Sequence, residues 1–383
     1  MANTFTPIIP NLTTAMQRVA QEMAPLPALA QTEFKAEEAA LNQSVTIPIA
    51  PTVAGVNRTP AAQFSVAADR AVTNTSITIT KDRAFPFHMT GDDFARIRQN
   101  PDFIPASLQQ AIRSWRNEVH SDLADLAASA AGWYSASAGA SGAAFGTAGT
   151  DPFASNYDVL VDAYNALTDS LAPLEGRFAM IDTKANANLN KLGVLTKANE
   201  AGSTDALRNG FIGRLAGFDV AVANVVARPA IGTGSGYLVN GALSAGATTI
   251  TVDTGSGTIL AGDVVTFGAD TTQYVVATAL SGSTFVLSSG LVANVADNAA
   301  VAVQARSRRN IAAHREGFGL AIRLPKLPPE GDAGEHQVIV DPVTGIGVRF
   351  STYKGYGLNN YELSSAWGVA AVRKELIKNI LGG

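Results

Sequence analysis

The sequence predicts an α+β fold in which a small all-β unit interrupts a larger mixed domain. Stretches with helical spacing of apolar residues alternate with short strand-like stretches along most of the chain. Between Arg228 and Arg306 the composition changes, because there is no lysine or arginine and the only charged residues are aspartates. Ordinary composition resumes on both sides, which indicates a separate module inserted into a host domain.

The bulk composition narrows the class of protein. The 383 residues are enough for about two or three domains. Hydrophobic residues make up 46% and charged residues 16%, which excludes a disordered chain and indicates apolar surface buried between subunits. A net charge of −4 without a lysine and arginine cluster argues against a dedicated nucleic-acid binder. The absence of cysteine excludes disulfides and cysteine-ligated metals.

The N-terminal segment predicts an amphipathic arm. Pro7 and Pro10 interrupt the apolar core that an export signal would need, so no signal peptide is expected. Asn11 can cap a short helix that ends at Pro25 and Pro27. Its apolar stripe, Leu12, Met16, Val19 and Met23, has no neighbouring core, so we expect it to lie on another body, such as another subunit.

A long hairpin is predicted next. Val45, Ile47 and Ile49 alternate with other residues in one strand, and Ile77 and Ile79 do so in a second. Residues 51–74 between them show little periodicity, and loops of more than about 15 residues without structure of their own are usually functional or disordered.

The strongest helical pattern covers residues 105–131, about 40 Å at 1.5 Å per residue. Its apolar face comprises Leu108, Ile112, Trp115, Val119, Leu123 and Leu126. The Ala- and Gly-rich tract 127–149 lacks the apolar run of a membrane span and predicts a surface loop. A second helix is expected over 157–171, with strands around 178–181 and 218–222, as in a mixed α+β domain.

The inserted stretch predicts a small barrel or sandwich, because short apolar runs alternate with glycine-containing turns. The expected strands are 248–252, 264–267, 274–277, 284–287 and 300–303. The host then resumes with strands at 318–322, 338–340 and 346–350. Residues 367–381 fit either a helix or a terminal strand.

No motif in the sequence supports catalysis. Residues 253–256 read Asp-Thr-Gly-Ser, as in aspartic proteases, but no second Asp-Thr/Ser-Gly occurs and a plain turn is expected. The glycines at 232, 234 and 236 lack a following phosphate-binding lysine and predict a linker.

The histidines do not predict a metal site either. His88, His120, His314 and His336 lack metal-ligand spacing, and a local hydrogen bond is expected for His120. The sequence therefore predicts no catalytic, cofactor-binding or metal-ligating residue, and a protein that is not an enzyme.

The order of these parts resembles the tailed-phage major capsid proteins with the HK-97-like fold. Within that family it looks like the branch with an inserted β-barrel domain, typified by the coat protein of a Salmonella short-tailed phage. The resemblance is carried by Ala2-Asn3-Thr4 with the arm helix, by residues 217–226, by residues 314–325 and by the ending Trp367-Gly368-Val369 to Arg373-Lys374-Glu375. Lys374 stands where many relatives have proline, so the resemblance does not decide whether the last segment is a strand.

The resemblance implies a division of the chain into named parts. These are an N-terminal arm (1–43), an extended loop hairpin (44–82), a peripheral domain with the spine helix (83–132), an axial domain in two parts (133–227 and 307–344), the inserted β-barrel domain (228–306) and C-terminal strands that complete the peripheral domain (345–383).

The resemblance also implies a function without catalysis, namely self-assembly into an icosahedral shell around a double-stranded DNA genome. The expected partners are other copies of the chain in hexamers and pentamers, a scaffolding protein and a portal. The packaged DNA would be contacted only non-specifically, and no membrane is expected. The expected location is the virion capsid, assembled in the host cytoplasm. The alternative is another self-assembling phage structural protein, a tail tube subunit or a surface adhesin.

Two hypotheses concern contacts between subunits. Leu12, Met16, Val19 and Met23 would pack on an adjacent copy, and Arg58 and Arg70 on the hairpin would form charge pairs that set register. Some members of the family cross-link their shells through a lysine on the extended loop. Residues 51–74 contain no lysine, so non-covalent shells are expected here.

Overall fold

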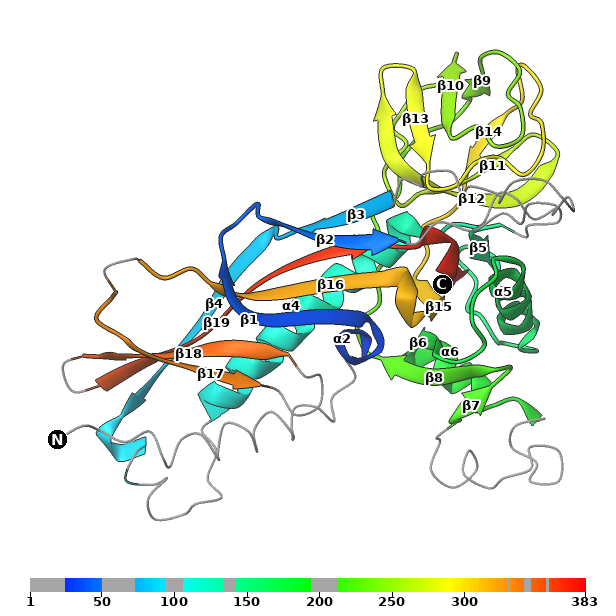
Figure 1. The fold of residues 1–383 in the computed structure, drawn as a ribbon. Coiled ribbons are helices and arrows are strands. Elements are labelled where there is room, and N and C mark those ends of the chain that lie inside the picture. The colour runs from blue at the N-terminus through cyan, green and yellow to red at the C-terminus, as the bar shows by residue number, and fades with distance from the viewer. Residues whose placement is uncertain are drawn as a thin grey trace, which may run out of the picture.

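The computed structural model describes residues 25–49, 73–93, 95, 106–133, 142–193, 212–328, 331–340, 346–355 and 358–383. The predicted arm helix with Leu12, Met16, Val19 and Met23 lies outside these residues, as do Arg58 and Arg70. The described chain mixes helices and strands, which confirms the α+β class (Figure 1).

The body contains two six-stranded sheets, and the one with the longer strands, called the main sheet, takes strands from both ends of the chain. Its order is β1 (Gln31–Ala39), β16 (Phe318–Pro325), β19 (Leu358–Ala371), β18 (Gly347–Lys354) and β17 (Glu335–Val340), and β4 (Lys81–Thr90) pairs with β19. β1 runs parallel to β16, and the other pairs are antiparallel. The predicted hairpin is present as β2 (Ser44–Ile49) paired antiparallel with β3 (Thr73–Thr78).

A long helix, α4 (Ala106–Ala130), lies across the main sheet (Figure 1) and matches the predicted helix to within one residue at each end. Its 25 residues span about 37 Å. The predicted apolar face is buried at Leu108, Ile112, Trp115, Val119 and Leu123. The same core contains a stack of rings in which Tyr361 lies 5.5 Å from Phe87 and 5.4 Å from Phe350.

The second sheet carries the shorter helices. Its order is β5 (Ala144–Phe145), β20 (Ile377–Leu381), β15 (Arg309–His314), β6 (Arg177–Asp182), β8 (Phe218–Ala223) and β7 (Arg214–Leu215). Helices α5 (Asp158–Asp169) and α6 (Thr183–Leu189) pack on it through a separate apolar cluster that includes Leu160, Leu167 and Phe218. Two short 3-10 turns, η1 (Arg315–Gly317) and η2 (Lys374–Leu376), carry the chain between the two sheets.

Between β8 and β15 the chain forms a small β-barrel. Its order is β14 (Val301–Val303), β11 (Val264–Phe267), β12 (Asp270–Ser281), β13 (Thr284–Leu287), β10 (Thr249–Asp253) and β9 (Leu238–Val239). A bridge between Leu238 and Ala300 joins β9 to the start of β14 and closes the ring. The five predicted strands are all present, and β9 is an addition that the sequence pattern does not reveal.

The structure differs from the sequence-based expectations at four places. The tract 127–149, expected as a surface loop, instead supplies the end of α4 and the buried strand β5 in the part that the structure describes, because its small side chains pack closely in the core. Residues 31–39, expected in the arm, form β1. Strand β4 was not predicted because Pro86 interrupts its pattern, and this proline is tolerated at the edge of the sheet. The C-terminal segment is β20, so the helical alternative is wrong, and Lys374 begins the 3-10 turn that precedes this strand.

Membership of the two sheets also differs from the expected division at residue 344. β16 and β17, expected in the second axial part, lie in the main sheet, whereas β20, expected with the peripheral strands, lies in the second sheet. Composition marks where the chain turns, but it does not specify which sheet a buried strand joins.

Candidate functional site at the base of the hairpin

The hairpin is seated on the main sheet at two glycines. Ile77 and Ile79, at the end of β3 and just after it, are fully buried. A Cβ atom on Gly368 of β19 would lie 2.0 Å from the carbonyl oxygen of Thr78, and one on Gly319 of β16 would lie 2.6 Å from Ile77 Cδ1. Only residues without a side chain allow the hairpin to approach the sheet this closely.

Backbone hydrogen bonds fix the same junction. Thr80 donates its N–H to the carbonyl of Trp367 at 3.1 Å. Asn42 donates to Ile79 O, and Ile79 donates to Gln43 O, each at 2.9 Å. Ile79 also packs with Ala39 and Ala366 in a small apolar cluster of its own. The base of the hairpin is therefore held to the sheet through its backbone and through two buried isoleucines.

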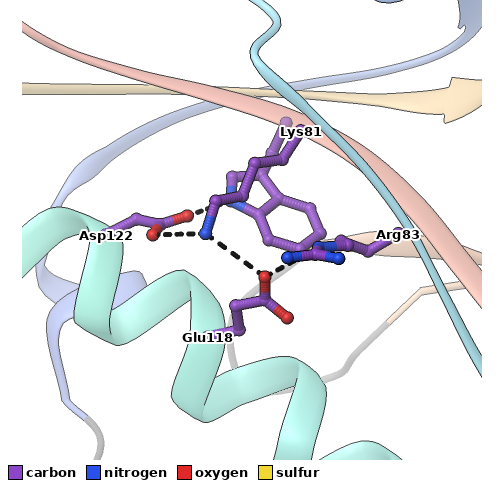
Figure 2. Close-up of polar contacts among 5 residues, drawn as sticks. Lys81, Arg83, Glu118 and Asp122 are labelled. Carbon is purple, nitrogen blue, oxygen red and sulfur yellow. Dashed lines mark hydrogen bonds and ion pairs between the residues drawn. The ribbon is translucent and has the colours of Figure 1, made fainter.

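A network of charged residues then joins the first residues of strand β4 to helix α4, and Figure 2 shows its geometry. The ammonium of Lys81 lies 2.7 Å from Asp122 Oδ1 and 3.2 Å from Glu118 Oε1. Arg83 Nε lies 2.9 Å from the same Glu118 oxygen. The indole N–H of Trp367 donates to the second oxygen of Asp122 at 2.8 Å. We call these five residues the hairpin-base network.

The sequence places these side chains together for a simple reason. Lys81 and Arg83 are two residues apart on a strand and so point to one face, and Glu118 and Asp122 are four residues apart on a helix and do the same. Trp367 is the register partner of Lys81 on β19. Two basic residues two positions apart on a strand and two acidic residues four positions apart on a helix are the signal that could have identified the network from sequence. Our sequence analysis missed this signal.

The electrostatics of the network favour its charged state. Burial opposes the charge on Lys81, but its hydrogen bonds to Asp122 and Glu118 outweigh this and raise the pKa of Lys81 above its ordinary value. The side chains remain partly exposed, at 32% for Lys81 and 56% for Arg83. Such pairs orient the elements they join, but salt screens them, so their contribution to stability is modest.

The motifs weighed for catalysis have structural roles in the described chain. Residues 253–256 form the predicted turn, in which Thr254 has a φ of 57° and its hydroxyl donates to the carbonyl of Asp253 at 2.9 Å. The Gly-rich segment that starts at Gly232 is packed, because the N–H of Gly232 donates to the buried Asp263 carboxylate. His120 is held by hydrogen bonds to Leu26 and Val225, which are 94 and 105 positions away in the sequence, so the expectation of a local bond is wrong.

One arrangement has the residue types of a catalytic triad, but its serine is buried. His336 Nδ1 lies 2.9 Å from Ser351 Oγ and its Nε2 lies 2.6 Å from Asp332 Oδ1. Ser351 is only 1% exposed, so a substrate could not reach its hydroxyl. Asp332 also accepts from the hydroxyl of Tyr353 at 3.0 Å. These bonds join β17, β18 and the residues just before β17 into one rigid unit.

Within the part of the chain that the structure describes, no three His, Asp or Glu side chains are grouped so that they could hold a metal ion. No helix in that part of the chain combines the length and the apolar character that crossing a membrane requires.

Comparison with known proteins gives matches to solved structures only. No family model and no curated protein matches the sequence. The chain aligns over 93% of its length with 90% of a chain from Mycobacterium phage Che8, at 14% identity and a TM-score of 0.46. It aligns over 93% of its length with 86% of a chain in the capsid of cyanophage P-SCSP1u, at 12% identity and a TM-score of 0.47. A chain in the capsid of an empty GTA particle is similar over 94% of this chain and 97% of its own length, at 14% identity and a TM-score of 0.44.

Proposed function

We propose that this chain is the major capsid protein of a tailed phage, which self-assembles into a closed icosahedral shell around double-stranded DNA. Its partners would be copies of itself in hexamers and pentamers, together with a scaffolding protein and a portal. It would contact the packaged DNA only non-specifically and would have no catalytic activity. It would reside in the virion capsid after assembly in the host cytoplasm.

The observation that carries the proposal is the seated hairpin. Within the described chain, β2 and β3 pair only with each other. An isolated two-stranded hairpin is at best marginally stable in water, so one of this kind needs another surface to lie on. Its base is nevertheless fixed by Gly319, Gly368 and the hairpin-base network, which gives it a defined direction. A limb with a fixed base and an incomplete core suits a subunit that completes its fold on a neighbouring copy.

Further support comes from the organisation of the parts. We propose that residues 228–306 are an inserted domain and that the segment before α2 is an arm. In this arrangement α4 is a common support for the hairpin and for the barrel. Several modest contacts between copies, each of about 1,600 Å² in total, become strong together in a closed shell.

Electron microscopy of the purified protein tests this proposal, since closed polyhedral shells are expected. Tubes or fibres would instead favour a tail tube subunit or a surface adhesin. The double variant Leu12→Asp and Met16→Asp should abolish shells, because a charged stripe cannot pack on a neighbouring copy. Circular dichroism of the same variant should show that the subunit still folds. Normal shells from this variant would contradict the assignment of the arm.

A further inference from the structure

His120 of α4 connects three segments that are distant in the sequence. Its ring is 1% exposed. The N–H of Leu26, the first residue of α2 (Leu26–Leu29), donates to Nδ1 at 3.4 Å. Nε2 lies 2.8 Å from the carbonyl oxygen of Val225, which follows β8 on the way to the barrel. One imidazole therefore holds the segment next to the proposed arm, the long helix and the entry to the barrel.

These two partners specify the protonation state of the ring. Nδ1 accepts a backbone N–H, so it carries no proton, and Nε2 faces a carbonyl oxygen, so it carries the proton. The ring is therefore neutral when α2 is in place. Burial lowers the pKa of His120 below its ordinary value, and the hydrogen bond to Val225 only partly opposes this.

Within the part of the chain that the structure describes, no charged side chain stabilises an imidazolium at this position. Helix α2 contains no titratable residue, and the charged residue closest to Val225 in the sequence is the exposed Arg228. On α4 itself, Arg116 lies one turn before His120, and Glu118 and Asp122 bind Lys81. Burial and the bond to Val225 are the causes that set the His120 pKa, and no charged group is among them.

We propose that His120 is an acid-operated latch that holds α2 on the long helix and releases it when the ring is protonated. A proton on Nδ1 would direct an N–H at the N–H of Leu26, so the hydrogen bond would be replaced by repulsion. The charged ring would also have to leave its buried position or gain water. Leu26 is fully buried beside this site, so a movement of α2 would open the ring to water on that side. The latch would regulate the arm of the proposed capsid subunit, and in that respect it rests on the proposed function.

The direction of the pH effect follows from the two states of the ring. In the released state the ring has an ordinary pKa of about 6.5, and in the latched state its pKa is lower. The latched state is therefore fully stabilised above about pH 6.5 and loses this stabilisation as the pH falls through the lower value.

A distance measurement between two spin labels tests the latch. The chain has no cysteine, so the substitutions Ala28→Cys on α2 and Gln110→Cys on α4, both at exposed positions, allow specific labelling. We expect one narrow distance distribution at about pH 8 and loss of most of it to a broad distribution at about pH 5. The variant His120→Gln should keep the narrow distribution at both pH values, because an amide cannot be protonated in this range. The matched control His88→Gln, at an exposed histidine of β4, should respond to acid as the parent does.

Two outcomes would overturn the latch. One is a parent protein that stays folded by circular dichroism at about pH 5 and keeps its narrow distribution. The other is a folded His120→Gln variant that loses the narrow distribution as the parent does. If His120→Gln does not fold, the distance distribution of the parent, followed as the pH is lowered, still tests the latch. The latched state is fully stabilised above about pH 6.5, so release of α2 with a midpoint above that pH would contradict the proposal. The measurement uses unassembled subunits, so a failure to form shells is scored separately and counts against the capsid proposal alone.

Discussion

The two attachments to α4 differ in chemical character. At the base of the hairpin, charged side chains of β4 meet Glu118 and Asp122 at partly exposed positions. Beyond the C-terminal end of the helix, the contacts with the barrel are between neutral groups, while Arg309 of β15 separately donates to the carbonyl of Gly262 in the barrel. The ring of Trp133 lies edge-on to that of Tyr274 at 5.4 Å, and the backbone N–H of Trp133 donates to Ser289 Oγ at 3.0 Å. The hydroxyl of Ser288 donates to the carbonyl of Ala131.

This difference separates contacts that respond to salt from contacts that do not. Half-exposed ion pairs contribute little and are weakened by salt, so at the hairpin they add an adjustable term to the backbone bonds and buried isoleucines that hold its base. Buried aromatic and hydroxyl contacts are insensitive to salt and are costly to break. The contacts between α4 and the barrel should therefore be equally strong at low and high salt, whereas the hairpin-base network should weaken as salt is added.

Removing the aromatic contact at the barrel should give the largest effect. Trp133 is 7% exposed. The substitution Trp133→Ala would delete a buried ring and its edge contact with Tyr274, and should lower the free energy of unfolding by about 3–5 kcal/mol. Denaturant unfolding at low and at high salt measures this. The loss should be the same in both, because no charged group takes part.

Trp133→Phe is the matched control for this change. It keeps an aromatic ring against Tyr274, so the loss should stay below about 1.5 kcal/mol. A loss from Trp133→Ala that falls strongly in high salt would show that the attachment of the barrel depends on charge, and the contrast with the hairpin would disappear.

The helix and the barrel strands could be predicted from the sequence, but the contacts that attach the hairpin could not. The helix at 106–130 and the barrel strands follow from local periodicity and turn residues, which depend only on near neighbours in the chain. The seat of the hairpin depends on which strand crosses Gly319 and Gly368, and no local pattern contains that information. The hairpin-base network joins residues that are far apart in the sequence; Trp367 and Asp122, for example, are 245 positions apart.

The C-terminal end shows how a local pattern can mislead. Val369, Val372, Leu376 and Ile380 fall at helical spacing by coincidence, because a strand, a 3-10 turn and a second strand follow one another there. All five residues of β20 are buried, so its sequence shows no alternation. The proposed contact residues of the arm and of the hairpin tip stay predictions, since they lie outside the described residues.

Filling the seat of the hairpin should give an intermediate effect. The substitution Gly368→Ala places a Cβ 2.0 Å from the backbone oxygen of Thr78, so the hairpin must lift or the sheet must deform. We expect a loss of about 1–3 kcal/mol in the free energy of unfolding, together with faster hydrogen exchange at Ile79 and Thr80. Gly91→Ala is the control, because a Cβ at Gly91 would meet no atom within 4 Å. Equal stability of the two variants would show that the hairpin is not seated on this glycine.

Neutralising the hairpin-base network should give the smallest effect and the one most sensitive to salt. Asp122→Asn keeps an acceptor for the indole N–H of Trp367 but removes the charge 2.7 Å from Lys81. We expect a loss of about 1 kcal/mol at low salt that shrinks at high salt, measured by denaturant unfolding. Glu335→Gln is the control. It removes the ion pair between Glu335 and Lys354, whose side chains are 45% and 61% exposed, and should lower the free energy of unfolding by less than about 0.5 kcal/mol. If Asp122→Asn cost the same at every salt concentration, the contacts at the base of the hairpin would be as insensitive to salt as those at the barrel, and the contrast between the two attachments would disappear.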